Sequence, residues 1–218
     1  FVMESARENG DVVSARKGVS DFRIDIRGRA AHAGVEPEKG RSAILEAANK
    51  TLALQELNGR WPGVTVNVGV IEGGTRSNVI AERCRLKVDV RSSAEESFRA
   101  VEAEVTRIGE RSTVPDVECA VESGSWHRPF EKKGGSALLA AEAIRIASEL
   151  GFELHDAPTG GASDANTTSA AGVPTLDGLG PVGGDDHAPS EWSDLPSVPT
   201  RIALLSGLLS RAGAVVGG

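Results

Sequence analysis

The stretch Val64–Val90, VTVNVGVIEGGTRSNVIAERCRLKVDV, alternates apolar and polar residues at both of its ends. Alternation with a period of two places every second side chain on the same face of a β-strand. Val64–Val70 and Cys84–Val90 are therefore each expected to form a half-buried strand, and Gly73-Gly74 breaks the chain between them. The centre of the sequence thus predicts two consecutive strands.

The segments on either side of this pair complete a known arrangement. Upstream, Phe22–Ile26 alternates as a strand, and Ile44, Ala48 and Leu52 recur at helical spacing. Downstream, Phe98–Ile108 carries a helical stripe and Val117–Val121 alternates again. The order β-α-β-β-α-β predicts a ferredoxin-like, split βαβ domain. Its two helices would cover one face of the sheet, so we expect the other face and an edge strand to need cover, by oligomerisation.

The second of these helices has a start signal. Ser93-Ala94-Glu95-Glu96 has the form of a capping box, with Ser93 as the N-cap and Glu96 three residues on. This interpretation also accounts for the paired acids Glu95 and Glu96, which we therefore do not take as a catalytic pair.

The C-terminal part has a different pattern. Leu139–Leu150 is an apolar stripe at helical spacing that Gly151 stops. It is followed by a Gly-rich turn at Thr159–Asp164, a short apolar run at Val173–Leu176 that we take as a strand, and the loop Gly178–Glu191. A closing helix carries Ile202, Leu205 and Leu209. Helix, loop, strand, loop and helix are typical of the end of an α/β domain.

Composition excludes several classes of protein. The 218 residues include 24 Lys and Arg against 31 Asp and Glu, a net charge of −7, so a nucleic-acid-binding surface is not expected. No apolar run approaches the ~20 residues that span a bilayer, so we expect no membrane partner. Two cysteines, Cys84 and Cys119, fit a reducing compartment, and we expect a cytoplasmic protein. The chain opens at Phe1, which suggests a start inside something larger.

Two histidines are candidates for chemistry. His187 lies in the loop GGDDHAPSE, residues 183–191, where it could ligate a metal or be hydrogen-bonded to a neighbouring carboxylate; one histidine alone favours the second interpretation. His32 lies among small residues in GRAAHAG, residues 28–34, where it could donate to an oxyanion or carboxylate, or have no role.

Other polar residues are ambiguous when taken singly. Thr159–Asp164 could cradle an anion with its backbone or be a plain turn. Arg128 could bind a carboxylate bidentately or form a surface salt bridge. Asn78 could donate to a carbonyl oxygen or complete a turn. Glu4, near the start, is more often a solvated carboxylate at the end of a strand than a catalytic one.

Taken together, the motifs resemble one family. Gly28–Gly40, Gly73–Ile80 and Val88–Arg91 are similar to three blocks of the dimerisation domain of M20 zinc peptidases. Thr159–Asp164 and the His187 loop are similar to two blocks of the family's catalytic domain. The blocks occur in the family's order along the whole chain, which most resembles the glutamate carboxypeptidase (carboxypeptidase G2-like) branch.

The resemblance implies an amidohydrolase with two zinc ions that works as a homodimer through the ferredoxin-like domain. Glu4 and His187 fall at the positions of one protein ligand to each zinc. His32 corresponds to the histidine that crosses the dimer to the neighbouring active site and holds the scissile carbonyl or the substrate carboxylate. Asn78 and Arg128 match positions that bind the substrate's carboxylate, and Ser163 lies where the Gly-rich turn lines the pocket.

The sequence also departs from the family. The His-x-Asp ligand motif, the bridging Asp and the Glu-Glu pair that supplies the general base are absent. We therefore expect the C-terminal portion of an M20 enzyme: residues 1–18 as a remnant of the catalytic domain, 19–122 as the dimerisation (lid) domain, and 123–218 as the rest of the catalytic domain. A tight zinc site needs three or more protein ligands, so this chain alone is expected to bind zinc weakly or not at all and to be inactive.

The resemblance implies a small substrate, a peptide or an N-acyl amino acid with a free carboxylate. Three alternatives stay open. The chain could belong to a deacylase of N-acyl-ornithine or N-succinyl-diaminopimelate, it could be a non-catalytic dimerisation module, or the missing residues could have been lost by proteolysis or reside on a separate segment.

Overall fold

A computed structural model describes residues 1–217. For Ser125 and Trp126 within this range it describes the backbone but not the side chains. The chain divides into two compact units, each with a hydrophobic core of its own. Unit 2 is the continuous segment Gly18–Trp126. Unit 1 combines Phe1–Lys17 with the chain from His127 onward. Unit 1 is therefore built from two segments between which unit 2 is inserted in the sequence.

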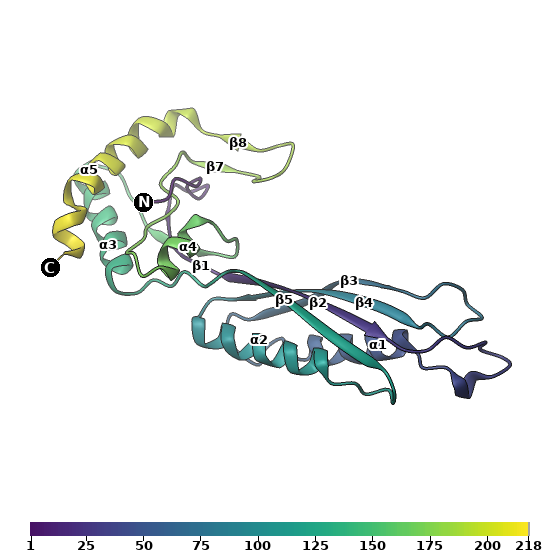
Figure 1. The fold of residues 1–218 in the computed structure, drawn as a ribbon. Helices are drawn as coiled ribbons and strands as arrows, with labels where there is room; N and C mark the ends of the chain where they lie inside the picture. The colour runs from purple at the N-terminus through teal and green to yellow at the C-terminus, as the bar shows by residue number, and fades with distance from the viewer. Residues whose placement is uncertain (218) are drawn as a thin grey trace. The chain divides into compact units, whose positions relative to one another are not determined.

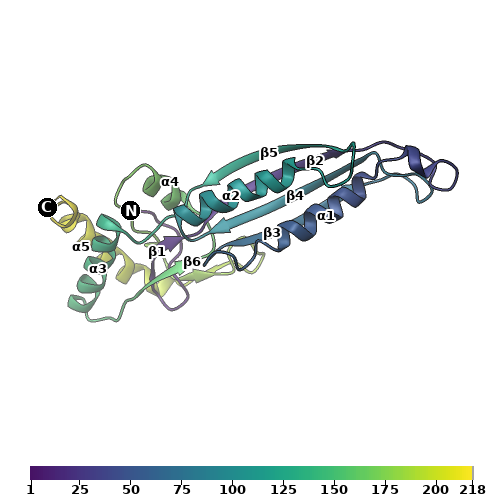
Figure 2. The same cartoon turned by 90° about the horizontal axis from the view of Figure 1, so that it is seen from below.

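Unit 2 is an antiparallel sheet with two helices on one face. The strands β2 (Gly18–Arg27), β3 (Thr65–Gly73), β4 (Arg83–Ser92) and β5 (Glu118–His127) lie in the order β3-β4-β2-β5. The helix α1 (Ala43–Gln55) covers β3 and β4, and α2 (Glu95–Glu110) covers β4 and β2. The two helices lie side by side beneath the sheet (Figures 1 and 2). The element order β-α-β-β-α-β confirms the predicted ferredoxin-like domain.

The core of unit 2 follows the alternation of the strands. The helix-facing residues of β2 and β4 pair across the ladder, for example Ile24 with Leu86 and Phe22 with Val88, and all four are buried. From α2, Val101 and Val105 pack onto them and are also buried. Alternate residues of β2 and β4 therefore face the helices, as the period of two predicts.

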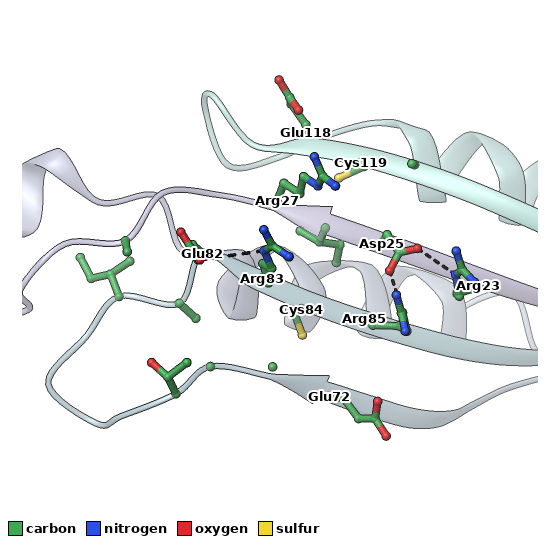
Figure 3. A pocket seen from close by; sticks show the side chains of 18 of the residues that line it. Arg23, Asp25, Arg27, Glu72, Glu82, Arg83, Cys84, Arg85, Glu118 and Cys119 are labelled. Carbon is green, nitrogen blue, oxygen red and sulfur yellow. Dashed lines mark hydrogen bonds and ion pairs between the residues drawn. The ribbon is translucent and has the colours of Figure 1, made fainter.

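The other face of the sheet carries ion pairs, and the expectation that it is covered by oligomerisation stays a prediction. On this face the Asp25 carboxylate lies 2.8 Å from Arg23 and 2.7 Å from Arg85, and Arg23 also lies 2.7 Å from Glu122. Burial tends to raise the pKa of Asp25, but the hydrogen bonds from Arg85 and Arg23 hold it below its usual value. Figure 3 shows Arg23 and Asp25 on β2 and Arg85 on the adjacent β4, where they line a pocket. Charged residues therefore neutralise one another on this face of the sheet.

The apolar stripe expected for α1 faces outward. Ser42 caps the helix by accepting a hydrogen bond from the Leu45 N–H. The inward face consists instead of small and charged side chains and one leucine: Ala43, Glu46, Ala47, Lys50 and Leu54. Ile44 is 43% exposed and Leu52 is 67% exposed. The helix is confirmed, but the stripe of Ile44, Ala48 and Leu52 lies on the surface.

The capping box predicted for α2 is wrong. The N-cap is Ala94, which makes no side-chain cap hydrogen bond, and the helix begins at Glu95. The Ser92 hydroxyl, one residue before the expected cap, accepts from the Ala94 N–H at 3.3 Å. Glu95 and Glu96 lie in the first turn, where acidic side chains stabilise a helix through its dipole. They therefore still belong to a helix start.

Unit 1 has a small parallel sheet and two long packed helices. β1 (Val12–Arg16) pairs with β6 (Asp156–Thr159), and α3 (Gly134–Glu149) packs against α5 (Val198–Val216). A short helix α4 (Asp164–Ala170) follows the Gly-rich turn. The remaining elements are a hairpin, β7 (Gly183–Gly184) with β8 (Trp192–Ser193), and two 3-10 turns, η1 (Pro37–Lys39, in unit 2) and η2 (Leu195–Ser197).

Two predictions for unit 1 need correction. Val173–Leu176 forms no strand; only Asp177 after it makes an isolated bridge, to Val13. The closing helix exists, but Ile202 and Leu209 are exposed, and its buried leucines are Leu204 and Leu208. The core of α3 at Leu139, Ala143 and Ile146 agrees with the predicted stripe. Among residues 1–217, no helix is long and apolar enough to span a membrane.

Candidate functional site

The structure brings His32 and Asn78 together at one end of unit 2. The backbone of His32 bridges to Val79, and the Ala33 N–H donates to the Asn78 carbonyl oxygen at 3.0 Å. Both His32 and Asn78 are exposed. The backbones of two loops that lie far apart in the sequence are therefore held together, and each loop carries an exposed polar side chain.

The hydrogen bonding of His32 sets its tautomer. The Gly34 N–H donates to His32 Nδ1 at 3.1 Å. An acceptor nitrogen carries no proton, so the neutral ring holds its proton on Nε2. The loop thus presents an N–H donor to the solvent, which is the form needed to stabilise an oxyanion or bind a carboxylate.

The base of the His32 loop is closely packed. A Cβ on Gly28 would overlap the carbonyl oxygen of Arg41, so the two ends of the loop need glycine to approach each other. Arg41 donates from Nη1 to the carbonyl oxygens of Glu38 and Gly40 at 2.8 and 2.7 Å. It also donates from Nε to Asp116 at 3.1 Å. No local motif marks Arg41, whose contacts join distant segments.

In unit 1, Arg128 and Ser163 are linked through Asn166. The Asn166 amide donates to the Arg128 carbonyl oxygen at 2.8 Å, and its Oδ1 accepts from the Ser163 N–H at 3.0 Å. Ser163 is the N-cap of α4 and accepts from the Ala165 N–H at 3.1 Å. Asn166 completes a capping box, a role that the sequence S-D-A-N at residues 163–166 could have suggested.

The Gly-rich turn also rests on a buried ion pair that sequence reasoning missed. Arg16 Nε lies 2.6 Å from Asp177 Oδ2, and the Asp177 side chain is fully buried. The two residues are 161 positions apart. No local motif marks either of them, because their function arises only when β1 meets the segment after α4.

Glu4 and His187 lie on neighbouring segments of unit 1. The Gly180 N–H donates to the Glu4 carbonyl oxygen at 2.9 Å, and Ala6 forms a parallel bridge with Val182, just before the His187 hairpin. Residues 1–5 form no regular strand, so Glu4 does not end one. Both Glu4 and His187 are exposed.

The hairpin loop that carries His187 has an unusual backbone. Asp185 and His187 adopt φ angles of +59° and +65°, a region that non-glycine residues rarely occupy. The His187 N–H donates to a Glu191 carboxylate oxygen at 3.3 Å. Backbone strain of this kind is concentrated at functional sites, which is consistent with a role for this loop.

The donors present are too few for a tight zinc site. A carboxylate and an imidazole are ordinary zinc ligands. Among residues 1–217, however, no group of three or more His, Cys, Asp and Glu side chains is arranged to hold a metal ion. Glu4 and His187 have the right chemistry but do not by themselves complete a coordination shell.

Comparisons with known proteins show what the chain is similar to. Residues 14–116 match the peptidase dimerisation domain of the M20 type. Carboxypeptidase G2 of Pseudomonas sp. (strain RS-16) is 27% identical over 199 residues, covering 90% of this chain and 48% of the relative. An N-acetyldiaminopimelate deacetylase of Halalkalibacterium halodurans is 29% identical over 102 residues, covering 43% of this chain and 27% of the relative.

A solved structure, the aminopeptidase PepT from Bacillus cereus ATCC 10987, superposes with a TM-score of 0.80 at 26% identity, covering 97% of this chain and 56% of that one. The chain thus contains a dimerisation domain of the kind found in peptidases. It is homologous to carboxypeptidase G2 and other hydrolases of the M20 family. The chain spans about half the length of curated relatives that it matches along most of its own length.

Proposed function

We propose that this chain supplies the dimerising and substrate-holding part of a zinc-dependent amidohydrolase. The substrate would be a peptidyl or N-acyl amino acid with a free carboxylate, as in glutamate carboxypeptidases. The observation that carries the proposal is the pairing of His32 and Asn78 at one end of a peptidase dimerisation domain. With the two backbones held together, the imidazole N–H of His32 and the carboxamide of Asn78 can each donate to oxygens of an acyl group or a carboxylate.

The proposed roles follow from the groups that each residue offers. His32, from one subunit, donates its Nε2–H to the carbonyl or carboxylate oxygen of a substrate bound in the partner subunit. Asn78 donates its amide beside it, and Arg128 binds the substrate's carboxylate. The N–H groups of Gly161 and Ala162, which have no acceptor among the described residues, add donors on the Gly-rich turn.

The proposed enzyme uses two zinc ions, and Glu4 and His187 would each offer a ligand to one of them. Because two donors do not complete a site, we expect the chain on its own to bind zinc weakly and to lack hydrolase activity. The measurement is metal content after dialysis together with an assay of acyl-amino-acid hydrolysis. Stoichiometric zinc with turnover would overturn this expectation.

The residue roles are tested in a hydrolytically active form of the protein. His32→Ala should lower kcat/KM about 100-fold or more, as removal of an oxyanion donor does. His155→Ala removes an exposed histidine of unit 1 and is the matched control, with unchanged kinetics expected. Equal effects of both substitutions would refute the role of His32.

A deacylase of the same type is the second candidate, favoured by the similarity to an N-acetyldiaminopimelate deacetylase. Profiling N-acyl-glutamate against N-acyl-diaminopimelate and N-acyl-ornithine separates the two functions. The free thiols of Cys84 and Cys119 support a reducing compartment such as the cytoplasm.

A further inference from the structure

The Gly-rich turn Thr159–Asp164 is held from beneath by a buried carboxylate. The side chain of Asp177 has no exposed surface. It accepts hydrogen bonds from Arg16 Nε at 2.6 Å, from the Ser163 hydroxyl at 2.6 Å and from the Gly178 N–H at 2.5 Å. A buried carboxylate is tolerated only when it is paired and hydrogen-bonded, and Asp177 meets both conditions.

Arg16 reaches the turn by two routes. Its side chain is 10% exposed, and its Nη1 donates to the Gly161 carbonyl oxygen at 3.2 Å. Through Asp177 the same guanidinium is connected to Ser163. A planar group with several N–H donors in fixed directions can hold both acceptors at once, which a lysine ammonium does less well.

The Ser163 hydroxyl proton is used inside the protein. The hydroxyl donates this single proton to Asp177, and its oxygen accepts from the Ala165 N–H at 3.1 Å. It has no proton left for a ligand. The sequence-based assignment of Ser163 as a substrate contact therefore needs another explanation, in which the hydroxyl fixes the turn and the backbone does the binding.

The segment that carries Asp177 also pairs with the segment of Glu4. Arg201, buried in α5, donates to the carbonyl oxygens of Gly178 and Gly180, the latter at 3.0 Å. The Gly180 N–H in turn donates to the Glu4 carbonyl oxygen at 2.9 Å. Asp177 thus connects the Gly-rich turn with the proposed metal-ligand segment.

We propose that Arg16 and Asp177 are the positioning pair of the Gly-rich turn, and that Ser163 is a positioning residue and not a ligand contact. The pair holds the N–H groups of Gly161 and Ala162 in place for a ligand carboxylate. The identity of that ligand rests on the proposed function, whereas the positioning of the turn does not.

The test is hydrogen exchange of the whole chain, measured by NMR without ligand. The N–H groups of Ser163, Ala165 and Asn166 are hydrogen-bonded within the cap and report on the turn. Arg16→Lys should speed their exchange on the order of tenfold, while amides of α3 and α5 keep their rates. Arg211→Lys, at a surface ion pair with Glu149 in the same unit, should change neither set.

Two serine variants make the result independent of Arg16. Ser163→Ala should speed exchange at Ala165, whereas Ser163→Thr, which keeps the hydroxyl, should restore the original rate. If Arg16→Lys does not fold, this pair alone decides. The proposal fails if the cap amides stay within about twofold of their original rates, or if exchange rises equally in α3 and α5, since that marks a general loss of stability. Failure of the chain to bind any acyl amino acid would count only against the proposed function.

Discussion

At the scale of single residues, the most unusual feature of unit 2 is a buried ion pair beneath α1. Lys50 Nζ lies 3.1 Å from Glu46 Oε1, and both side chains are almost fully buried. Lys50 also donates to the carbonyl oxygens of Ile108 and Arg111 at 2.8 Å each. Lys50 thereby caps the end of α2 with a positive charge, where the helix dipole favours one.

Glu46 completes the same network on the other side. Its Oε2 accepts from the Thr113 N–H at 2.9 Å, the Thr113 hydroxyl at 2.7 Å and the Val114 N–H at 2.7 Å. Removing one partner leaves an uncompensated buried charge. We predict that Glu46→Ala lowers the free energy of unfolding by about 3–5 kcal/mol, measured by urea denaturation. Glu110→Ala, on the surface of the neighbouring helix, should change it by less than about 0.5 kcal/mol.

The same carboxylate makes stability depend on pH. Burial tends to raise the pKa of Glu46, but hydrogen bonds from Val114, Thr113 and Lys50 outweigh it and lower the pKa below its usual 4.5. A lowered pKa in the folded state stabilises the protein above pH 4.5 and loses that stabilisation as the pH falls through the folded-state value. The free energy of unfolding should therefore decline less steeply with acid in Glu46→Gln than in the original chain. Identical slopes would refute this assignment.

At the scale of elements, α1 has apolar side chains on its solvent side. Ile44, Leu45 and Leu52 are exposed on a helix that covers the edge strand β3. An exposed apolar stripe beside an unpaired strand edge fits a second copy of the chain, as the match to a dimerisation domain suggests.

We predict that Ile44→Lys combined with Leu52→Lys weakens dimerisation at least about 100-fold, because each copy would lose two buried aliphatic side chains. Sedimentation velocity over a range of concentrations measures the effect. Leu209→Lys places the same charge on an equally exposed leucine of α5, in unit 1, and should leave the dimer intact. A dimer that survives the double substitution would exclude this face.

Replacement by alanine should have opposite effects on stability at two glycines of α5. Around Gly213 there is open space for a Cβ, so Gly213→Ala should raise the free energy of unfolding by about 0.5–1 kcal/mol through better helix propensity. At Gly207 a Cβ would lie 2.8 Å from Ile146 Cγ2, so Gly207→Ala should lower stability by separating α5 from α3. Thermal denaturation of both variants measures the contrast, and a shift of the same sign in both would contradict it.

At the scale of the whole molecule, the two units should differ in their ability to fold alone, because unit 2 is inserted between the two segments of unit 1. Unit 2 is one continuous segment, so a fragment of residues 18–126 should fold with a dispersed NMR spectrum and a cooperative thermal transition. Residues 127–217 alone lack β1, which supplies Val12 to the core and Arg16 to Asp177, and should not fold. A folded C-terminal fragment or an unfolded central one would contradict the division.

Much of the architecture could be predicted from local pattern. Strands such as Cys84–Val90 are recognisable because one face is buried and one is hydrated, and this alternation is written directly in the sequence. The phase of α1 could not be predicted, because Lys50 and Glu46 are buried only through partners more than 50 positions away. The stripe of Ile44 and Leu52 consequently lies on the exposed side of the helix.

The sequence by itself determined the order of strands and helices in unit 2 and the motifs around His32, Asn78, Arg128, Ser163 and His187, since each depends on neighbouring residues. Only the tertiary structure decided that Ser163 turns its hydroxyl to Asp177, that Arg16 neutralises that carboxylate, and that His32 lies beside Asn78. The physical reason is that burial and hydrogen bonding between distant segments exist only once the chain has folded, and no local spacing encodes them.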